Sequence, residues 1–511
     1  MAADSSNPQI KSIIKTLVFQ PDAFTSEQAY QAIHEIMSGV ATEAQIAAFL
    51  MACRLTRKDA KPEVVVACER AIQEHALNTR FENAVLADEI VDRTGGDGQN
   101  TFNVSTTAAI VAAGGVKIAK IKSIIKTLVF QPDAFTSEQA YQAIYEIMSG
   151  VATEAQIAAF LMACRLTRKD AEPEVVVACG RAMQEHALNI HFKDALADEI
   201  VDIVGTGGDG QNTFNVSTTA AIVAAGAGVK IAKHGNRAAS SSSGSADFLE
   251  SYGCALINVA PEMVPDILVK HNFCFLFAQK YHPAMKNAAG LRREIGIPTI
   301  FNILGPLTNP AKPRRIIVGV HSRNLGELMI EALKLSGVKK AMVVCGAEGL
   351  DEISTAGYTY KHSSKIDVGN MTRIAAPLHY TMHRKTFSSD NYHRLLFHYQ
   401  TWTLSDSGVI TASTVHPTHD FGLATHELDS VRGGTPAENV RTLERILAGN
   451  LLVDDPVLDF VLLNAAGVLF VAGKAATFKE GVALAKNAIV LGKAKKALDG
   501  FMWATRTQDK S

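Results

Sequence analysis

The chain contains one segment twice, and only the second copy continues into further sequence. Ile10–Lys120 and Ile121–Lys233 both open with IKSIIKTLVFQPDAFTSEQAYQAI, and both reach VKIAK. The first copy then restarts, whereas the second runs on into HGNRAASSSSGSADFLE. A glycine-rich loop also differs, because Val91–Thr106 is two residues shorter than its equivalent, Val201–Thr218. We therefore expect two related folded segments but one complete site, formed by the second copy and the sequence after it.

Length and composition limit the classes of protein that the chain can belong to. A chain of 511 residues is too long to fold around a single hydrophobic core, so two or more domains are expected. A formal net charge of −1 gives no overall attraction to nucleic acid or to an anionic membrane. The N-terminus lacks the pattern of a signal peptide, and no apolar run approaches the ~18–20 residues that cross a bilayer. With seven scattered cysteines and no CxxC pair, we expect a cytoplasmic protein with reduced thiols.

Each copy begins with a helical pattern. In the second copy, apolar residues at helical spacing predict helices over 137–150, 153–166 and 174–188, with Thr153 as an N-cap and Gly150 as a stop. We therefore predict a small helical domain over 121–195. Residues 1–120 are predicted to be an incomplete extra copy of that domain and of the unit that follows it.

The periodicity changes near Glu199, where a short β-branched run ends in glycine and precedes a helix rich in small residues. A strand, a glycine-rich turn and a helix form the start of an α/β unit, and further units follow. Strands are predicted at 199–205, 229–235, 315–320 and 340–345, and helices at 217–228, 325–336, 456–472 and 478–498. We therefore predict an α/β domain with a mainly parallel central sheet over 196–511.

Residues 361–400 fit neither strand nor helix periodicity. Five of the chain's 16 histidines lie there, but their spacing is irregular and no paired ligand motif accompanies them. We expect an atypical insertion, either a loop or translated non-coding sequence, rather than a metal site.

The loop Gly205–Gly210 (GTGGDG) lies between a predicted strand and a predicted helix. Glycines let backbone N–H groups approach a phosphate, and a helix N-terminus adds partial positive charge. A tight turn without a ligand is the alternative. The hydroxyl and amide side chains that follow favour a phosphate site, since they can bond its oxygens: Thr213, Asn215, Ser217 and Thr218.

Three other patterns point to anionic substrates and a cation. Lys233–Arg237 (KHGNR) and the serines after it predict an anion loop at a strand end, although a flexible linker has a similar composition. Asp351 and Glu352 follow another strand and suit a hard cation such as Mg²⁺, or else form a solvated acidic turn. Arg292 could pair with a substrate carboxylate or be a surface charge.

The order of these motifs resembles that of the anthranilate phosphoribosyltransferase family. The matching series is GTGGDGxxTFNVST, KHGNRxxSS, SGSADxLExxG, HPAM, TIFNxLGPLxNP, GLDEIS, DFGL and NAA, covering nearly all of 121–498 outside 361–400. The resemblance implies a small helical domain plus a larger α/β domain of the nucleoside phosphorylase and phosphoribosyltransferase type, with the site in the hinge. It also implies that parts of 262–295 pack with the helical domain, and that two chains form a homodimer through that domain.

The implied reaction is that of an Mg²⁺-dependent pentosyltransferase of tryptophan biosynthesis. It transfers the 5-phosphoribosyl group of phosphoribosyl pyrophosphate to the amine of anthranilate, giving N-(5-phosphoribosyl)anthranilate and pyrophosphate. No covalent nucleophile is implied, and no nucleic acid or membrane partner.

The resemblance also assigns roles to residues of this chain. The residues implied to bind phosphoribosyl pyrophosphate are Gly205, Gly208, Asp209, Thr213, Asn215, Ser217, Thr218, Lys233, His234, Gly235, Asn236, Arg237, Ser240, Ser241 and Ser245. Those implied for anthranilate are Gly205, Asn236 and Arg292, and those for Mg²⁺ are Ser217, Asp351 and Glu352.

Two alternatives stay open at this point. A pyrimidine nucleoside phosphorylase-like enzyme would share the architecture, although KHGNR and the acidic pair favour the transferase. A non-catalytic homologue would fit the shortened first loop, the insertion, and Pro298 where the family usually has arginine. Because the first copy lacks equivalents of Asn236, Arg292 and the acidic pair, we expect it to be dispensable for catalysis. It could instead compete for the helices of a partner chain.

Overall fold

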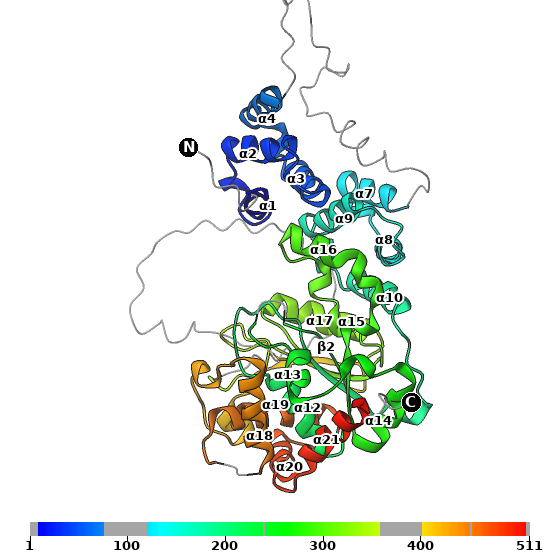
Figure 1. The fold of residues 1–511 in the computed structure, drawn as a ribbon, viewed down its shortest axis with the longest axis vertical. Helices are drawn as coiled ribbons and strands as arrows, with labels where there is room; N and C mark the ends of the chain where they lie inside the picture. The colour runs from blue at the N-terminus through cyan, green and yellow to red at the C-terminus, as the bar shows by residue number, and fades with distance from the viewer. Residues whose placement is uncertain (1–8, 76–119, 239–240, 358–400, 450–451, 507–511) are drawn as a thin grey trace, which may run out of the picture. The chain divides into compact units, whose positions relative to one another are not determined.

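The computed structural model describes residues 9–75, 120–238, 241–357, 401–449 and 452–506. The predicted insertion at 361–400, the shortened loop at 91–106 and Ser240 lie outside the described residues. Two compact units are present: residues 1–187 with 282–304, and residues 188–281 with 305–511 (Figure 1). The predicted domain boundaries at residues 120 and 195 stay predictions.

The first unit is helical and contains the two sequence copies. The first copy forms α1 (Ile10–Phe19), α2 (Ser26–Met37), α3 (Glu43–Leu55) and α4 (Pro62–His75). The second forms α7 (Ile121–Phe130), α8 (Ser137–Met148), α9 (Glu154–Leu166) and α10 (Pro173–Glu185), and α16 (Lys286–Ile295) joins them from a later part of the chain.

Helix ends in this unit follow from side-chain caps. Thr153 caps α9 as predicted, in a reciprocal capping box with Gln156. The helix predicted to reach Leu188 ends at Glu185, and the Leu188 N–H donates to the carbonyl of Tyr281 at 2.8 Å instead.

A buried glutamate caps α7 from outside the helix. The Glu146 carboxylate accepts from the N–H groups of Lys120 and Ile121 at 3.1 and 3.0 Å, and α7 has no side-chain cap of its own. Glu35 caps α1 in the same way. These bonds satisfy backbone N–H donors that the helix leaves unpaired. The negative charge of the carboxylate also interacts favourably with the positive end of the helix dipole.

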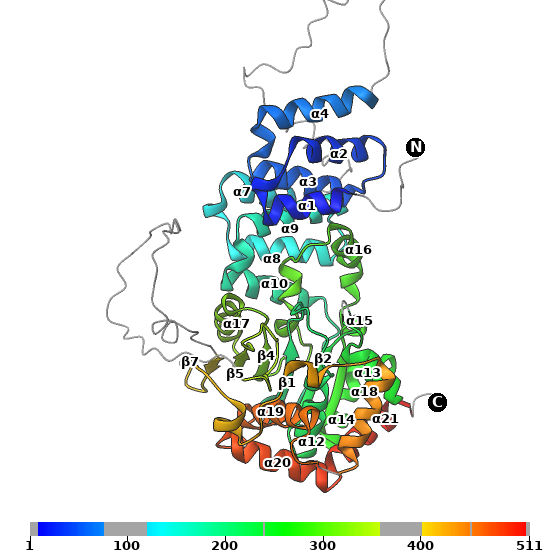
Figure 2. The same ribbon diagram turned by 90° about the vertical axis from the view of Figure 1, so that its left-hand side faces the viewer.

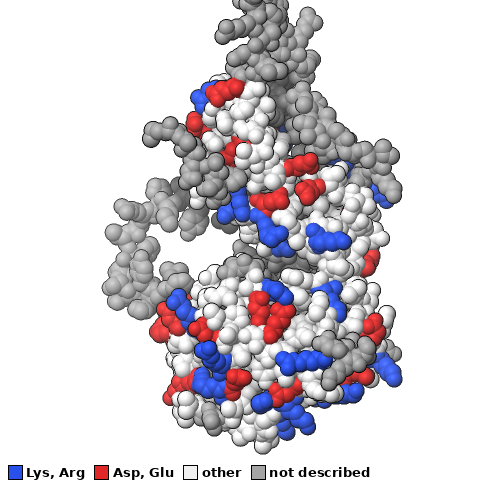
Figure 3. Space-filling view, viewed as in Figure 1, with Lys and Arg blue, Asp and Glu red and all other residues white. Residues whose placement is uncertain are grey.

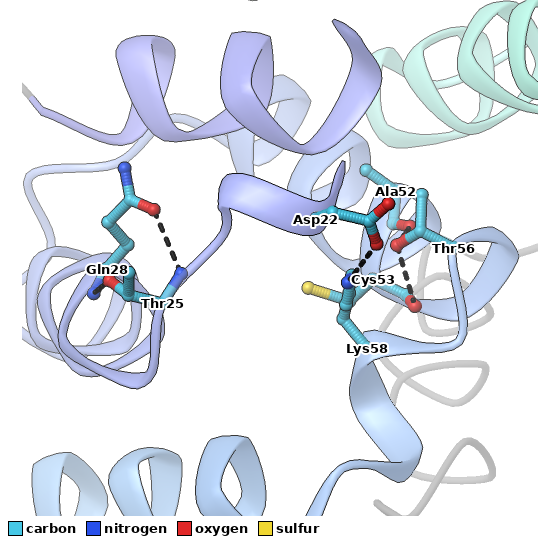
Figure 4. Close-up of polar contacts among 7 residues, drawn as sticks. All are labelled: Asp22, Thr25, Gln28, Ala52, Cys53, Thr56 and Lys58. Carbon is cyan, nitrogen blue, oxygen red and sulfur yellow. Dashed lines mark hydrogen bonds and ion pairs between the residues drawn. The ribbon is translucent and has the colours of Figure 1, made fainter. Parts of the chain in front are cut away.

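One of the few differences between the copies changes an ion pair. In the second copy Lys169 pairs with Glu172 at 2.8 Å. The equivalent of Glu172 is Lys61, which cannot accept, and in the first copy Lys58 reaches Asp22 at 3.3 Å instead (Figure 4). The two copies therefore keep the same backbone while their surface pairs diverge.

The second unit is built on a seven-stranded sheet of order β3-β2-β1-β4-β5-β6-β7, in which β3 to β5 are parallel and β6 and β7 antiparallel. The strands are β1 (Ile200–Gly205), β2 (Lys230–Gly235), β3 (Phe273–Phe277), β4 (Arg315–Gly319), β5 (Lys340–Val344), β6 (Thr401–Leu404) and β7 (Ile410–Ser413). The mainly parallel sheet is confirmed. Strand β3 was not predicted, because FCFLF is a short apolar run without alternation.

Helices cover this sheet. They are α11 (Asp194–Ala197), α12 (Val216–Gly226), α13 (Ser245–Tyr252), α14 (Val264–His271), α15 (Ala278–Tyr281), α17 (Arg323–Leu335), α18 (Pro436–Leu447), α19 (Pro456–Val471), α20 (Phe478–Val490) and α21 (Lys493–Arg506). Helices α12 and α19 are almost wholly buried and pack side by side against the strands, with α20 beyond them (Figure 2).

The single helix predicted over 478–498 is wrong. The chain leaves α20 near Leu491 and begins α21 at Lys493, with Gly492 between them at φ 63°. A left-handed residue ends a helix, and glycine adopts that conformation without steric cost.

Other bulk expectations can be compared with the structure. All seven cysteines are buried and free, as expected for reduced thiols. None of the described helices is long and apolar enough to span a membrane. On the face shown in Figure 3, basic and acidic side chains are interspersed, which agrees with the near-zero net charge.

Replacing Glu146 with alanine tests the buried cap. Because two backbone N–H groups would lose their acceptor, we expect the α7 amides to be less stable by about 2 kcal/mol, measured by native-state hydrogen exchange. Glu138→Ala removes an exposed glutamate of α8 that pairs with Arg181 at 3.2 Å, and should cost under about 1 kcal/mol. Equal losses in the two variants would contradict the capping role.

Candidate active site

The glycine-rich loop at the end of β1 folds as a phosphate-type loop. Three of its glycines have left-handed backbones, with φ of 68° at Gly207, 84° at Gly208 and 70° at Gly210. Gly205 has no such φ, but a Cβ there would overlap the Asp351 carboxylate. The Gly207 N–H donates to Asp351 Oδ2 at 2.8 Å. The structure therefore brings the predicted loop and the predicted acidic pair together.

Two threonine hydroxyls at this loop are unpaired within the described part of the chain. Thr206 follows β1, and Thr218 lies buried in the first turn of α12. Among the described residues, neither side-chain oxygen has a hydrogen-bond partner. Buried hydroxyls are normally paired, so these two mark a place where a ligand oxygen would complete the site.

Lys233 is a buried cation at the centre of the site. Its Nζ donates to the Ile203 carbonyl at 2.5 Å and lies 3.4 Å from Ser217 Oγ. Burial lowers the pKa of Lys233, while the neighbouring carboxylates of Asp202, Glu352 and Asp351 act to raise it.

Asp202, on β1, is fully buried and accepts two hydrogen bonds from neighbouring groups. It accepts from the His234 N–H at 3.3 Å and from Asn309 Nδ2 at 2.8 Å. Burial raises its pKa to about 6, against the effect of Lys233.

Asp351 and Glu352 repel each other in a partly buried position. Burial and then the charge of Asp209 raise the pKa of Asp351 to about 7. Burial and then Asp351 raise the pKa of Glu352 well above its ordinary value, while a hydrogen bond from Ser217 lowers it. Such a set of crowded carboxylates and a hydroxyl is stabilised by a cation, and these hard oxygen donors suit Mg²⁺.

The protein supplies only part of a coordination shell. In the described part of the chain, no three His, Cys, Asp or Glu side chains are arranged to hold a metal by themselves. Mg²⁺ usually binds through one or two carboxylates together with water and substrate phosphates. The predicted residues Ser217, Asp351 and Glu352 therefore fit an ion that arrives with a phosphorylated substrate.

Asparagines join the glycine loop to the serine loop. The side chain of Asn212 accepts from the Ser242 N–H at 3.0 Å. Asn215 Nδ2 donates to the Ser243 carbonyl at 2.9 Å, and its oxygen accepts from Ser243 Oγ at 2.9 Å. The two predicted anion loops are therefore one connected structure.

A turn far along the sequence supports both loops and was not predicted. Gly433 exchanges hydrogen bonds with Asn212, whose carbonyl lies 2.8 Å from the Gly433 N–H. A Cβ on Gly433 would overlap the Thr213 backbone. Asn439 Nδ2 donates to Asn215 Oδ1 at 2.8 Å. The available signal was the run RGGT before a helix, at residues 432–435.

A buried asparagine holds the segment that carries the acidic pair. Asn464 on α19 accepts from the Ile353 N–H at 3.0 Å and donates to the Ile353 carbonyl at 3.1 Å. His426 also supports this segment. Its backbone N–H donates to the Thr355 carbonyl at 3.0 Å, and its ring Nε2 lies 2.9 Å from Asp459 Oδ2. Asn464 stands in the NAA motif, to which sequence reasoning gave no role.

The other predicted residues are distributed around the end of β2. His234 is buried, Asn236 and Arg237 are exposed, and the Asn236 side chain accepts from the Arg237 N–H at 2.8 Å. Gly235 is packed closely, since a Cβ there would meet Phe275. Ser245 begins α13, while Ser241 is exposed on the loop before it.

Arg292 lies on α16, in the helical unit. Its Nη2 lies 3.5 Å from Asn302 Oδ1, and its guanidinium lies 5.6 Å from the ring centre of Phe301. Burial lowers its pKa. Its predicted contact with a substrate carboxylate stays a prediction.

Two family models match the chain. A model described as the α/β domain of a glycosyl transferase family matches residues 87–123, 197–379 and 392–495. A model described as the helical bundle domain of that family matches twice, at 11–76 and at 122–187.

Relatives with curated names point the same way. The chain is 39% identical to the anthranilate phosphoribosyltransferase of Schizosaccharomyces pombe, over 72% of this chain and 92% of that protein. It is 40% identical to the enzyme of that name from Methanobrevibacter smithii, over 73% of this chain and 95% of the relative.

Solved structures are also similar. The anthranilate phosphoribosyltransferase of Saccharomyces cerevisiae in complex with PRPP and Mg has a TM-score of 0.63 and 30% identity, covering 76% of this chain and 99% of that one. A structure of the same enzyme with 4-fluoroanthranilate gives a TM-score of 0.62.

The raised pKa of Asp351 predicts a pH effect on stability. A carboxyl group with a pKa near 7 in the folded chain and about 4 in the unfolded chain favours folding only while protonated. Stability of the metal-free chain should therefore fall as pH rises from about 4 to about 7. At pH 8 in EDTA, Asp351→Asn should be more stable than the unchanged chain by about 1–3 kcal/mol, measured by chemical denaturation.

Magnesium provides the matching control for Asp351. Added Mg²⁺ should raise the denaturation midpoint of the unchanged chain at pH 8 more than that of Asp351→Asn. Asp429→Asn, at an exposed position, should behave like the unchanged chain. The assignment would be wrong if Asp351→Asn kept the full response to pH and Mg²⁺.

Replacing Asn464 with alanine should release the acidic segment. The N–H and carbonyl of Ile353 would lose their partner, at a cost of about 2–4 kcal/mol in the free energy of unfolding. The gain in stability on adding Mg²⁺ should also shrink. The exposed Asn487 of α20 offers a control, because Asn487→Ala should change neither quantity measurably.

Proposed function

The chain belongs to the anthranilate phosphoribosyltransferase family, and we propose that it catalyses the reaction of that family. The 5-phosphoribosyl group of phosphoribosyl pyrophosphate is transferred to the amine of anthranilate. The C1–O bond to pyrophosphate breaks, the C1–N bond of N-(5-phosphoribosyl)anthranilate forms, and pyrophosphate and a proton are released.

One observation carries the proposal: a buried lysine, a glycine-rich loop and an acidic pair converge at the ends of parallel strands. Pyrophosphate leaves with a high negative charge, so groups that stabilise this charge lower the barrier. Lys233 supplies a fixed cation, and the loop from Gly205 and the first turn of α12 supply N–H and hydroxyl donors. When bound, Mg²⁺ would neutralise part of the pyrophosphate charge.

The protein is also expected to position the acceptor amine for attack. The anthranilate amine is a weak nucleophile, and holding it beside C1 removes much of the entropic cost of the reaction. No covalent intermediate is needed. The roles proposed for Ser217, Asp351 and Glu352 toward Mg²⁺, and for Asn236 and Arg292 toward anthranilate, rest on the family motifs.

The remaining assignments are also proposals. The residues from Gly205 to Thr218 and from Lys233 to Ser245 that the family resemblance assigns would hold phosphoribosyl pyrophosphate. The homodimer through the helical domain and the cytoplasmic location remain predictions.

An activity measurement tests the proposal directly. The full chain and a chain beginning at Ile121 are incubated with phosphoribosyl pyrophosphate, Mg²⁺ and anthranilate, and the loss of anthranilate fluorescence is followed. We expect turnover by both, since the first copy lacks equivalents of the acidic pair and of Arg292. Phosphorolysis of thymidine without anthranilate turnover would favour a nucleoside phosphorylase instead. Inactivity of both chains, and of a chain lacking 361–400, would favour a non-catalytic homologue.

Arg292→Ala tests acceptor recognition. Loss of a carboxylate partner should raise the KM for anthranilate about tenfold or more, with a smaller change for phosphoribosyl pyrophosphate. Arg293→Ala removes the exposed neighbouring arginine and should leave both constants unchanged. Equal increases for the two substrates in Arg292→Ala would count against carboxylate recognition.

A further inference from the structure

The two helical copies contact each other through the same helix of each copy. Helix α3 of the first copy packs against α9 of the second (Figures 1 and 2). Both helices have the sequence EAQIAAFLMACRL. A contact between identical elements is the form that an interface takes when two equal partners meet around a two-fold axis.

Cation–π pairs at the edge of this contact are reciprocal. The Arg54 guanidinium of the first copy lies 5.7 Å from the ring centre of Phe130 in the second. The Arg165 guanidinium of the second copy lies 5.9 Å from the ring centre of Phe19 in the first. Each pair is the other with the copies exchanged, because equivalent positions in the helices of the two copies differ by 111 residues, as at Ile10 and Ile121.

The first copy also contacts α16, which the chain contains once. Lys11 Nζ donates to the Arg293 carbonyl at 2.9 Å, and Thr42 Oγ1 donates to Glu294 Oε2 at 2.8 Å. The second copy contacts the other end of α16, where Asn287 Nδ2 donates to the Met148 carbonyl at 3.1 Å. Helix α16 is therefore held between the copies.

Burial shows which copy has the complete environment. Leu161 and Met162 of α9 are buried, whereas their equivalents in α3, Leu50 and Met51, are only partly buried. The α3–α9 contact covers equivalent faces of both helices, so this difference comes from neighbours that the second copy has in addition, such as residues 300–302 against α9.

We infer that the α9 face is a self-association surface of the helical bundle, and that the first copy occupies it within the chain. The first copy acts as a built-in partner, taking the position that a second chain would take. The full chain therefore has no free α9 face with which to form a homodimer, and for the full chain this inference replaces the homodimer predicted from the family resemblance. This inference rests on the helical unit alone and is independent of the proposed catalytic activity.

Cross-linking in the full chain tests which copies meet. Two double variants, Phe19→Cys with Arg165→Cys and Phe130→Cys with Arg54→Cys, are treated with a short bifunctional maleimide. The native cysteines are buried, so the introduced thiols are the accessible ones. Each variant is prepared with and without ¹⁵N label, and the two preparations are mixed before reaction. We expect cross-linked peptides from both variants, with no pair that joins a labelled to an unlabelled chain.

The controls and the mass complete the test. Phe19→Cys with Arg181→Cys should give little cross-link, since Arg181 lies over Tyr141 of its own copy, 4.3 Å from the ring centre. Light scattering of the unchanged chain should give the mass of a single chain, 54.8 kDa. Mixed labelled pairs, or a two-chain mass, would overturn the occupation within one chain. Absence of cross-links in both double variants would overturn the interface itself.

Discussion

The hydrogen bond from the Gly207 N–H to the Asp351 carboxylate is the contact on which the site depends. It joins the loop after β1 to the segment after β5. The loop proposed to bind phosphate therefore lies against the carboxylates proposed to bind Mg²⁺. Glycines make this approach possible, because a Cβ on Gly205 or on Gly319 would overlap Asp351. The parallel register places Gly205 beside Gly319 and makes the two strand ends coincide. Backbone packing, rather than a long side chain, therefore sets where the charges meet.

Much of the architecture could be predicted because local patterns and tertiary structure agree. The Thr153 cap, the strand ending at Gly205 and the order of α/β units all follow from short-range signals. Strand β3 and the break at Gly492 were missed for physical reasons. A five-residue apolar strand shows no periodicity, and a single left-handed glycine inside a helical pattern looks like a tolerated interruption.

The residues of the site also differ in how readily the sequence reveals them. Residues that would touch ligands have distinctive chemistry, and motifs expose them in the sequence. Residues that hold those motifs in place do not, since Asn439 and Asn464 act through contacts more than 100 positions away in sequence. The serine loop could be assigned to an anion, but its attachment to Asn212 and Asn215 emerges only from the fold.

The identical helices α3 and α9 give the molecule an internal comparison. One thirteen-residue sequence stands in two environments, with residues 156–164 all buried in α9 and three of their equivalents in α3 only partly buried. Intrinsic helix propensity is the same in both, so any difference in amide protection or in tolerance of substitution reports on surroundings alone. A single preparation of this chain thus separates what a sequence contributes to a helix from what its neighbours contribute.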